Sequence, residues 1–184
     1  SGGPSSVYED HAPDIDPNIF KLEIPILGIC YGLQLLIQQS TGSIHSKGIG
    51  EYGYAKLHLD SENLLFENVP NSTQVWMSHG DEISDPGKDW VVTARSGNEV
   101  IAAVAHNKKH IYGVQFHPEV SHTLHGNVIL SNFLFNISHC KPDWTPSYFI
   151  EESVDAIRER VGKEKVMVAL SGGVDSSVVG TLMH

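Results

Sequence analysis

The chain has 184 residues, with 22 Asp or Glu against 12 Lys or Arg, and a formal net charge of −10. This acidic balance argues against nucleic-acid binding, which needs a basic face, and no apolar run reaches the ~18–20 residues of a membrane-spanning helix. The two isolated cysteines, Cys30 and Cys140, form neither a disulfide framework nor a zinc pattern, and they fit a reducing, cytoplasmic location.

Residues 1–140 read as a mixture of strands and helices. The apolar, β-rich residues 24–29 predict a buried strand. Residues 33–40 have helical apolar spacing, with Gly42 as a plausible stop. Further elements follow: strands at 54–59, 74–77, 90–94, 99–105 and 111–116, and an apolar helix at 127–137. This mixture predicts an α/β fold with a central sheet.

The composition then changes. Residues 141–149 contain two prolines and no periodicity, which predicts a linker. Apolar residues at helical spacing over 150–161 predict an amphipathic helix, capped by Gly162. An apolar strand at 165–170 and the opening turns of a helix follow. We therefore expect a second α/β domain to start near residue 150, and the loop-like start and unfinished last helix predict a piece of a longer protein.

The stretch LGICYGLQ at 27–34 sets Cys30 between two glycines, after a predicted strand and before a predicted helix. Strand, Gly-x-Cys-x-Gly and helix is the layout of a nucleophile elbow. Gly28 and Gly32 leave room where strand and helix pass closely, and the helix N-terminus favours a thiolate. Taken alone, Cys30 fits a buried structural thiol equally well.

The stretch GVQFHPE at 113–119 offers a partner base. His117 ends an apolar strand, and Glu119 lies two residues on, where an extended chain points side chains to the same side. A carboxylate beside an imidazole fixes its tautomer and stabilises the imidazolium. Cys30, His117 and Glu119 are therefore the residue types of a nucleophile, a base and an orienting acid.

Together with SGGP at 1–4 and MSHGD at 77–81, these motifs resemble the class I (triad) glutamine amidotransferase family over residues 1–138. The resemblance implies an open sheet with flanking helices, lacking its N-terminal strand here, and hydrolysis of glutamine through a thioester on Cys30. It also implies an oxyanion hole made by the N–H groups of Gly3 and Tyr31. The implied glutamine-binding residues are Gln34, Ser78 and Asp81, with the Asp81 carboxylate pairing with the α-amino group.

The stretch LSGGVDSS at 170–177 follows an apolar run and opens a helix. Glycines at a helix N-terminus can form a nest of N–H groups for phosphate, although the Lys of a Walker A loop is missing and a plain capped turn would look the same. The stretch resembles the PP-loop of ATP pyrophosphatases. That resemblance implies binding of ATP with Mg²⁺ as a substrate complex, without a resident metal. The implied ATP-binding residues are Ser171, Gly172, Gly173, Val174, Asp175, Ser176 and Ser177.

An amidotransferase domain directly followed by a PP-loop resembles the family of glutamine-hydrolysing GMP synthases. In that family ATP activates xanthosine 5′-monophosphate (XMP), and ammonia from glutamine then converts it to GMP. The resemblance implies an amidotransferase domain at 1–140, a linker at 141–149, the start of the synthetase domain at 150–184, and a homodimer formed by a C-terminal domain absent here. Alternatives are a γ-glutamyl hydrolase, the amidotransferase part of another synthase, and a non-catalytic binding module. The PP-loop and the complete triad argue against them.

Overall fold

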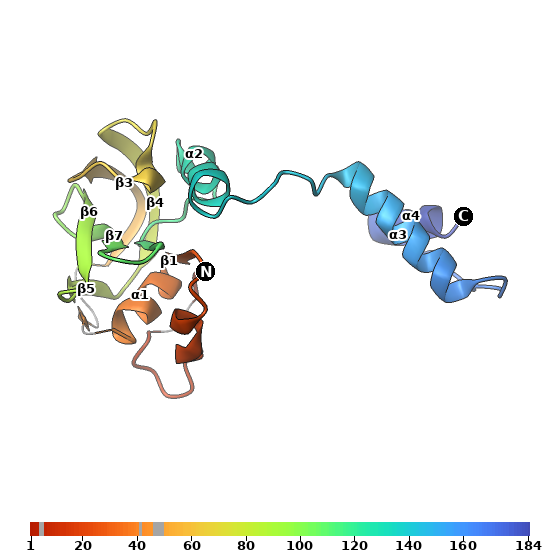
Figure 1. Cartoon of the computed structure of the whole chain (residues 1–184), viewed down its shortest axis with the longest axis horizontal. Helices are drawn as coiled ribbons and strands as arrows, with labels where there is room; N and C mark the ends of the chain where they lie inside the picture. Colours follow the sequence, from red (N-terminus) through yellow and green to blue (C-terminus); the bar gives the residue numbers. More distant parts are fainter. Residues whose placement is uncertain (4–5, 41, 46–49) are drawn as a thin grey trace. The chain divides into compact units, whose positions relative to one another are not determined.

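The computed structural model describes residues 1–3, 6–40, 42–45 and 50–184, so Pro4 of the SGGP turn lies outside the described residues. These residues form two compact units, Ser1–His139 and Cys140–His184 (Figure 1). No helix among them is both long and apolar enough to cross a membrane.

A six-stranded sheet, counted over the described residues, organises the first unit, in the order β1-β8-β7-β6-β3-β4. Its strands are β1 (Ile26–Ile29), β3 (Glu51–Leu59), β4 (Ser72–His79), β6 (Trp90–Ser96), β7 (Ile101–His106) and β8 (Ile111–Val114). β1 pairs in parallel with β8, and the other neighbours pair antiparallel. The predicted α/β fold with an open sheet is confirmed. Sequence patterns missed a small antiparallel pair, β2 (Ser43–His45) and β5 (Glu82–Asp85).

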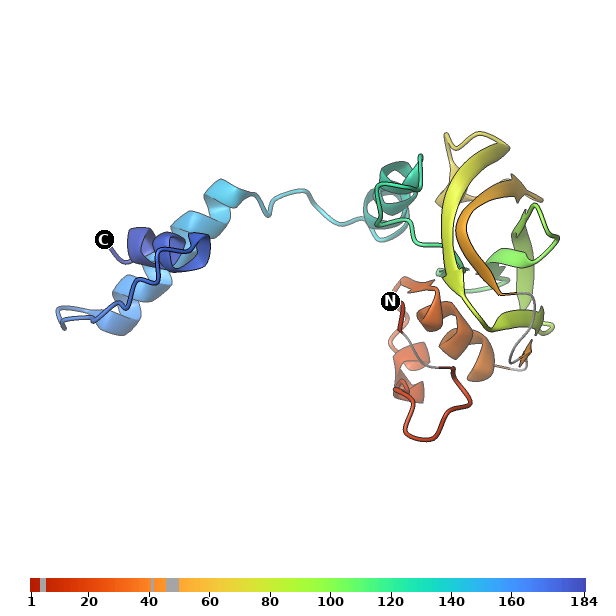
Figure 2. The same cartoon turned by 180° about the vertical axis from the view of Figure 1, so that it is seen from behind.

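Helices cover both faces of this sheet (Figures 1 and 2). The helix α1 (Tyr31–Gln38) packs on β1 and β8, and the other face carries η2 (Leu64–Phe66), α2 (Gly126–Ser131) and the wide-turned η3 (Asn132–Ile137). A short helix, η1 (Pro17–Lys21), precedes β1.

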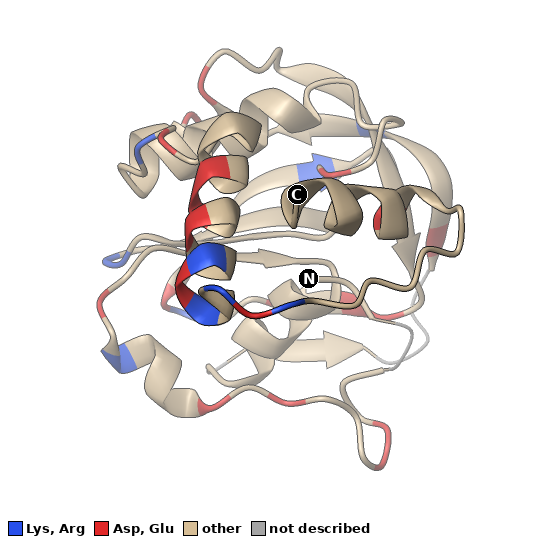
Figure 3. Cartoon of the chain, turned by 90° about the vertical axis from the view of Figure 1, so that its right-hand side faces the viewer, with Lys and Arg blue, Asp and Glu red and all other residues tan. Residues whose placement is uncertain are grey.

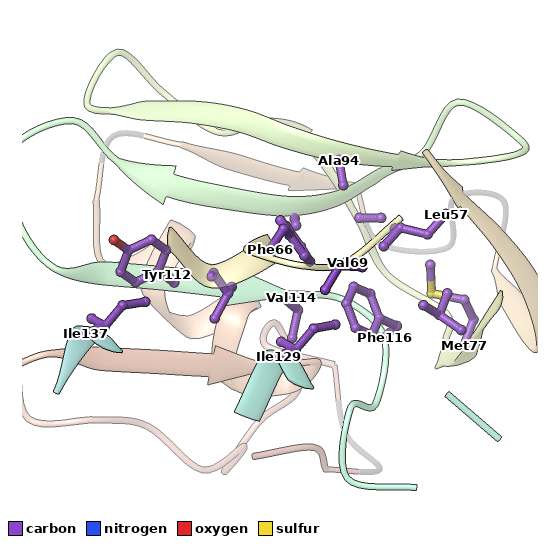
Figure 4. Close-up of a cluster of buried hydrophobic side chains, with 14 residues drawn as sticks. Leu57, Phe66, Val69, Met77, Ala94, Tyr112, Val114, Phe116, Ile129 and Ile137 are labelled. Atoms are coloured by element: carbon purple, nitrogen blue, oxygen red, sulfur yellow. The ribbon is translucent and has the colours of Figure 1, made fainter. Parts of the chain in front are cut away.

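Alternation along β8 separates the two apolar clusters that fill these faces. Ile111 belongs to the cluster around α1, whereas Tyr112 and Val114 belong to the cluster with α2 and η3, which Figure 4 shows. A Cβ added at Gly113 would lie 2.2 Å from Leu33 Cδ1, so glycine lets α1 approach the sheet. This close packing fixes the N-terminus of α1 at the end of β1.

The second unit contains α3 (Pro146–Val161) and α4 (Val174–Leu182). The helix α3 begins inside the predicted linker, because Thr145 accepts a hydrogen bond from the Tyr148 N–H and Pro146 suits a first turn. It ends at Gly162, whose φ is 60°. Figure 3 shows acidic residues near its start and basic ones near its end, and Arg158 and Arg160 in the last turn complement the helix dipole.

The strand predicted at 165–170 is wrong. These residues form no regular element, and Met167 is 97% exposed. A strand takes its hydrogen bonds from a neighbouring strand, and the described residues of this unit contain none. Apolar composition alone therefore does not make a strand here.

Candidate active site

A tight bend at Cys30 joins β1 to α1. The backbone of Cys30 has φ 51° and ψ −108°, a strained combination for a residue with a side chain, and its N–H donates to Val114 O over 2.8 Å. A Cβ at Gly28 would lie 2.6 Å from Leu36 Cδ1 and 2.8 Å from Gly32 O. The bend therefore needs glycine on its strand side, and it sets the sulfur at the N-terminus of α1.

His117 follows β8 and is held on both sides of its backbone. Its N–H donates to Trp76 O over 3.0 Å, and its carbonyl accepts from Thr123 Oγ1 over 2.6 Å. Its ring Nδ1 lies 2.7 Å from Glu119 Oε1. Because the carboxylate only accepts, Nδ1 carries a proton and Nε2 faces the other way.

Gly2 marks the place where Cys30 and His117 meet. A Cβ added at Gly2 would lie 2.7 Å from His117 Cε1, 3.5 Å from His117 Nε2 and 3.7 Å from Cys30 Cβ. The imidazole and the thiol-bearing residue therefore flank one point on the glycine backbone. A hydrogen bond with Cys30 raises the pKa of His117 to about 9, burial opposes this, and the hydrogen bond to Glu119 reinforces it. The ring is thus an imidazolium at neutral pH.

The Cys30 sulfur has two further partners. Its thiol donates to Ser78 O over 3.6 Å, and it accepts from Gln115 Nε2 over 3.6 Å. Gln34 Nε2 donates to Gln115 Oε1 over 3.3 Å and to Asp81 O over 3.1 Å. The structure therefore brings three predicted glutamine-binding residues, Gln34, Ser78 and Asp81, into the network around the nucleophile.

Sequence reasoning missed Gln115, although a signal for it exists. It lies two residues before His117, and extended backbone directs such a pair to one side. Its side chain is fully buried, which is unusual for glutamine and indicates satisfied hydrogen bonds.

The segment with Ser78 and Asp81 is anchored from behind. Asp81 is buried and accepts a hydrogen bond from the Ser6 hydroxyl. His79 Nδ1 lies 2.9 Å from Asp81 O, and its Nε2 lies 3.4 Å from Glu51 Oε2. Sequence reasoning treated this stretch only as a polar turn plus binding residues, because the partner Glu51 is distant in sequence.

The two residues predicted for the oxyanion hole are neighbours. A Cβ at Gly3 would lie 3.5 Å from Tyr31 Cγ, so the Gly3 backbone runs against the first residue of α1. The Tyr31 hydroxyl donates to Pro13 O over 2.6 Å, which ties the N-terminal segment to this helix. Both backbones lie beside the bend that carries Cys30.

The predicted ATP-binding residues lie in the second unit, at the start of α4. Gly172 has φ 81°, and Gly173 precedes the helix, whose first turn contains Val174 and Asp175. Local bonds hold the loop: Ser171 Oγ accepts from Gly173 N, and the hydroxyls of Ser176 and Ser177 donate to Gly173 O over 3.0 and 2.9 Å. A bound phosphate would have to replace these hydroxyl contacts.

Comparison with known proteins finds relatives that match both units. GMP synthase [glutamine-hydrolyzing] from Nostoc sp. (strain PCC 7120) is 48% identical over 184 residues, and that from Synechocystis sp. (strain PCC 6803) is 47% identical. Each match covers all of this chain but 34% of the relative. The chain thus spans about a third of the length of these curated relatives.

Solved structures and a family model agree with this result. A protein described as part of a putative GMP synthase from Thermoplasma acidophilum has a TM-score of 0.63 and 31% identity, covering 73% of this chain and 63% of its own. A glutamine amidotransferase from Thermotoga maritima shares the fold, with a TM-score of 0.52 and 22% identity over 90% of this chain and 62% of its own. The model named glutamine amidotransferase class-I matches residues 1–137. The chain belongs to the class-I glutamine amidotransferase family.

Proposed function

We propose that the first unit hydrolyses the side-chain amide of glutamine, with Cys30 as nucleophile, His117 as proton carrier and Glu119 as the carboxylate that orients it. The observation that carries this proposal is the geometry of His117. Its Nδ1 is occupied by Glu119 at 2.7 Å, and its hydrogen bond with Cys30 joins the two reacting groups. This is the nucleophile–base–orienter arrangement that covalent catalysis uses.

The reaction follows from these positions. The Cys30 thiolate attacks the amide carbon, and the carbonyl oxygen becomes an oxyanion that the N–H groups of Gly3 and Tyr31 stabilise. The His117 imidazolium donates its proton to the leaving nitrogen, the C–N bond breaks, and ammonia and a glutamyl thioester remain. Water then attacks the thioester, His117 takes its proton, and glutamate leaves with the thiol restored.

Three residues next to the sulfur are assigned to glutamine binding. Gln34, Ser78 and Asp81 lie in the hydrogen-bond network around Cys30. We assign the Asp81 carboxylate to the α-amino group, which requires it to exchange its Ser6 partner.

The wider proposal concerns the whole protein. We infer that this chain is the amidotransferase part of a GMP synthase, joined by a linker at 141–149 to the start of a synthetase domain at 150–184. The name of the curated relatives and the match over all 184 residues support it. ATP with Mg²⁺ would bind at the loop before α4, activate XMP, and let ammonia displace AMP. Its glycines and helix N-terminus suit a phosphate group. We further propose that this protein is a cytoplasmic homodimer.

Exchanging the nitrogen source tests the assignment in the complete protein that it requires. Cys30→Ala should reduce glutamine-dependent GMP formation at least ~10³-fold and leave ammonia-dependent formation intact, because only the first step uses the thiol. Cys140→Ala, which changes the other, exposed cysteine, should behave as wild type. Equal loss of both activities in Cys30→Ala would refute the division of labour.

The synthetase half has its own test. Asp175→Ala should suppress ATP–pyrophosphate exchange and leave glutaminase measurable. Unchanged exchange would remove the ATP assignment while leaving the glutaminase proposal standing.

A further inference from the structure

A fully buried amide, that of Gln115, lies between the candidate nucleophile and Gln34. Its nitrogen is 3.6 Å from Cys30 Sγ, and its oxygen is 3.3 Å from Gln34 Nε2. The mechanism above gives Gln115 no part. A buried polar side chain of this kind is retained only where its partners compensate for the lost water.

The orientation of this amide follows from one group that cannot be reversed. The backbone carbonyl of Asp81 only accepts hydrogen bonds, so the atom of Gln34 that faces it, 3.1 Å away, must be the nitrogen. The same nitrogen reaches Gln115, whose facing atom must then be its oxygen. The remaining atom, Gln115 Nε2, therefore points its N–H at the sulfur.

Two contacts at the sulfur favour opposite forms of the thiol. Ser78 O accepts a hydrogen bond from the S–H group, so it favours the protonated form. Gln115 donates to sulfur, and a donor holds an anion more strongly than a neutral acceptor. Its N–H also comes from a side chain without charge, which leaves the His117–Glu119 pair unperturbed.

We propose that Gln115 is a positioning residue that holds the Cys30 sulfur in its reactive form and place. This rests on the proposed role of Cys30 as nucleophile. Gln34 fixes the direction of the Gln115 amide and so acts on the sulfur at one remove. Because Gln115 has no direct contact with glutamine in this scheme, its loss should lower kcat and change KM little.

The test measures the rate at which iodoacetamide alkylates Cys30 in the full chain, in a Cys140→Ala background and without glutamine. Gln115→Met keeps the length of the side chain and removes the donor, and should slow alkylation about 10- to 100-fold. Gln115→Glu keeps an acceptor for Gln34 but turns a carboxylate toward the sulfur, and should slow it more. Gln34→Met frees the Gln115 amide to reverse and should slow alkylation about 3- to 10-fold.

Asn132→Leu is the matched control. Asn132 is a buried amide in the other apolar face of the sheet, where it donates to Leu65 O and Glu67 O. Its loss should lower the urea midpoint without changing alkylation. Gln115→Met and Gln115→Glu that remain folded and react at the wild-type rate would overturn the proposal, as would equal rates for both.

The two proposals fail separately, because alkylation needs no glutamine. If Gln115 variants react slowly but the wild-type chain releases no ammonia, the glutaminase proposal falls and the role of Gln115 stands. If ammonia release and its KM are the same in Gln115→Met as in wild type, the role of Gln115 falls and the glutaminase proposal stands.

Discussion

The two units use the same local device, a glycine turn leading into a helix, with different results. In the first unit, the turn at Cys30 follows β1, which pairs with β8 and packs under α1. In the second, the turn at Gly172 follows residues 165–170, which are as apolar but lie exposed without a described strand beside them. Turns and helices are thus specified locally, whereas a strand depends on a partner that sequence does not reveal.

Core truncation should break the two units very unequally. Phe116 is fully buried, so Phe116→Ala should lower the free energy of unfolding of the first unit by about 3–5 kcal/mol. Met167 is 97% exposed, and Met167→Ala should change unfolding by less than about 0.5 kcal/mol. Urea titration of both variants measures the difference, and similar losses would remove the contrast.

Filling the point beside Gly2 should damage the site without unfolding the unit. The Cβ of Gly2→Ala would lie 2.7 Å from His117 Cε1 and displace the ring, so glutaminase should fall about 100-fold. Gly97→Ala is the control, because its Cβ would meet nothing closer than 3.8 Å. Ammonia release and the urea midpoint are measured together. Full activity in Gly2→Ala would mean that His117 does not lie against this segment during catalysis.

The titration of His117 sharpens the account of the site. Its pKa of about 9 in the folded chain lies above the ordinary value of 6.5. The stabilisation that it provides is therefore complete below pH ~6.5 and is lost as pH rises through 9. In Cys30→Ala and in Glu119→Gln, an NMR titration of the ring should move its midpoint down toward 6.5, further in Cys30→Ala. An unchanged midpoint in both variants would contradict the assigned contacts.

The smallest expected effect concerns how each unit holds its first helix. The cap residue of α1, Cys30, makes no side-chain capping bond, and buried packing holds that helix. None of the described residues of α3 is buried, so its start depends more on Thr145. Thr145→Ala should cost about 1 kcal/mol, visible as faster amide exchange in the first turn of α3. Unchanged exchange there would show that the cap is dispensable.

Much of the fold was accessible from sequence, since alternation and turn residues are local signals. The bend at Cys30 and the spacing of His117 and Glu119 were equally legible, because few other reasons require those residues there. The rest depends on non-local contacts. Gln115 acquires its partner from the bend after β1, and the buried His79 meets Glu51 from another strand.

The central claim is that Cys30 forms a covalent bond with glutamine. Rapid chemical quenching of the chain during turnover, followed by mass spectrometry of its peptides, tests this directly. We predict a glutamyl thioester on the peptide that contains Cys30, absent from Cys30→Ala. Steady release of ammonia with no adduct on that peptide, or with the adduct on Cys140, would contradict it.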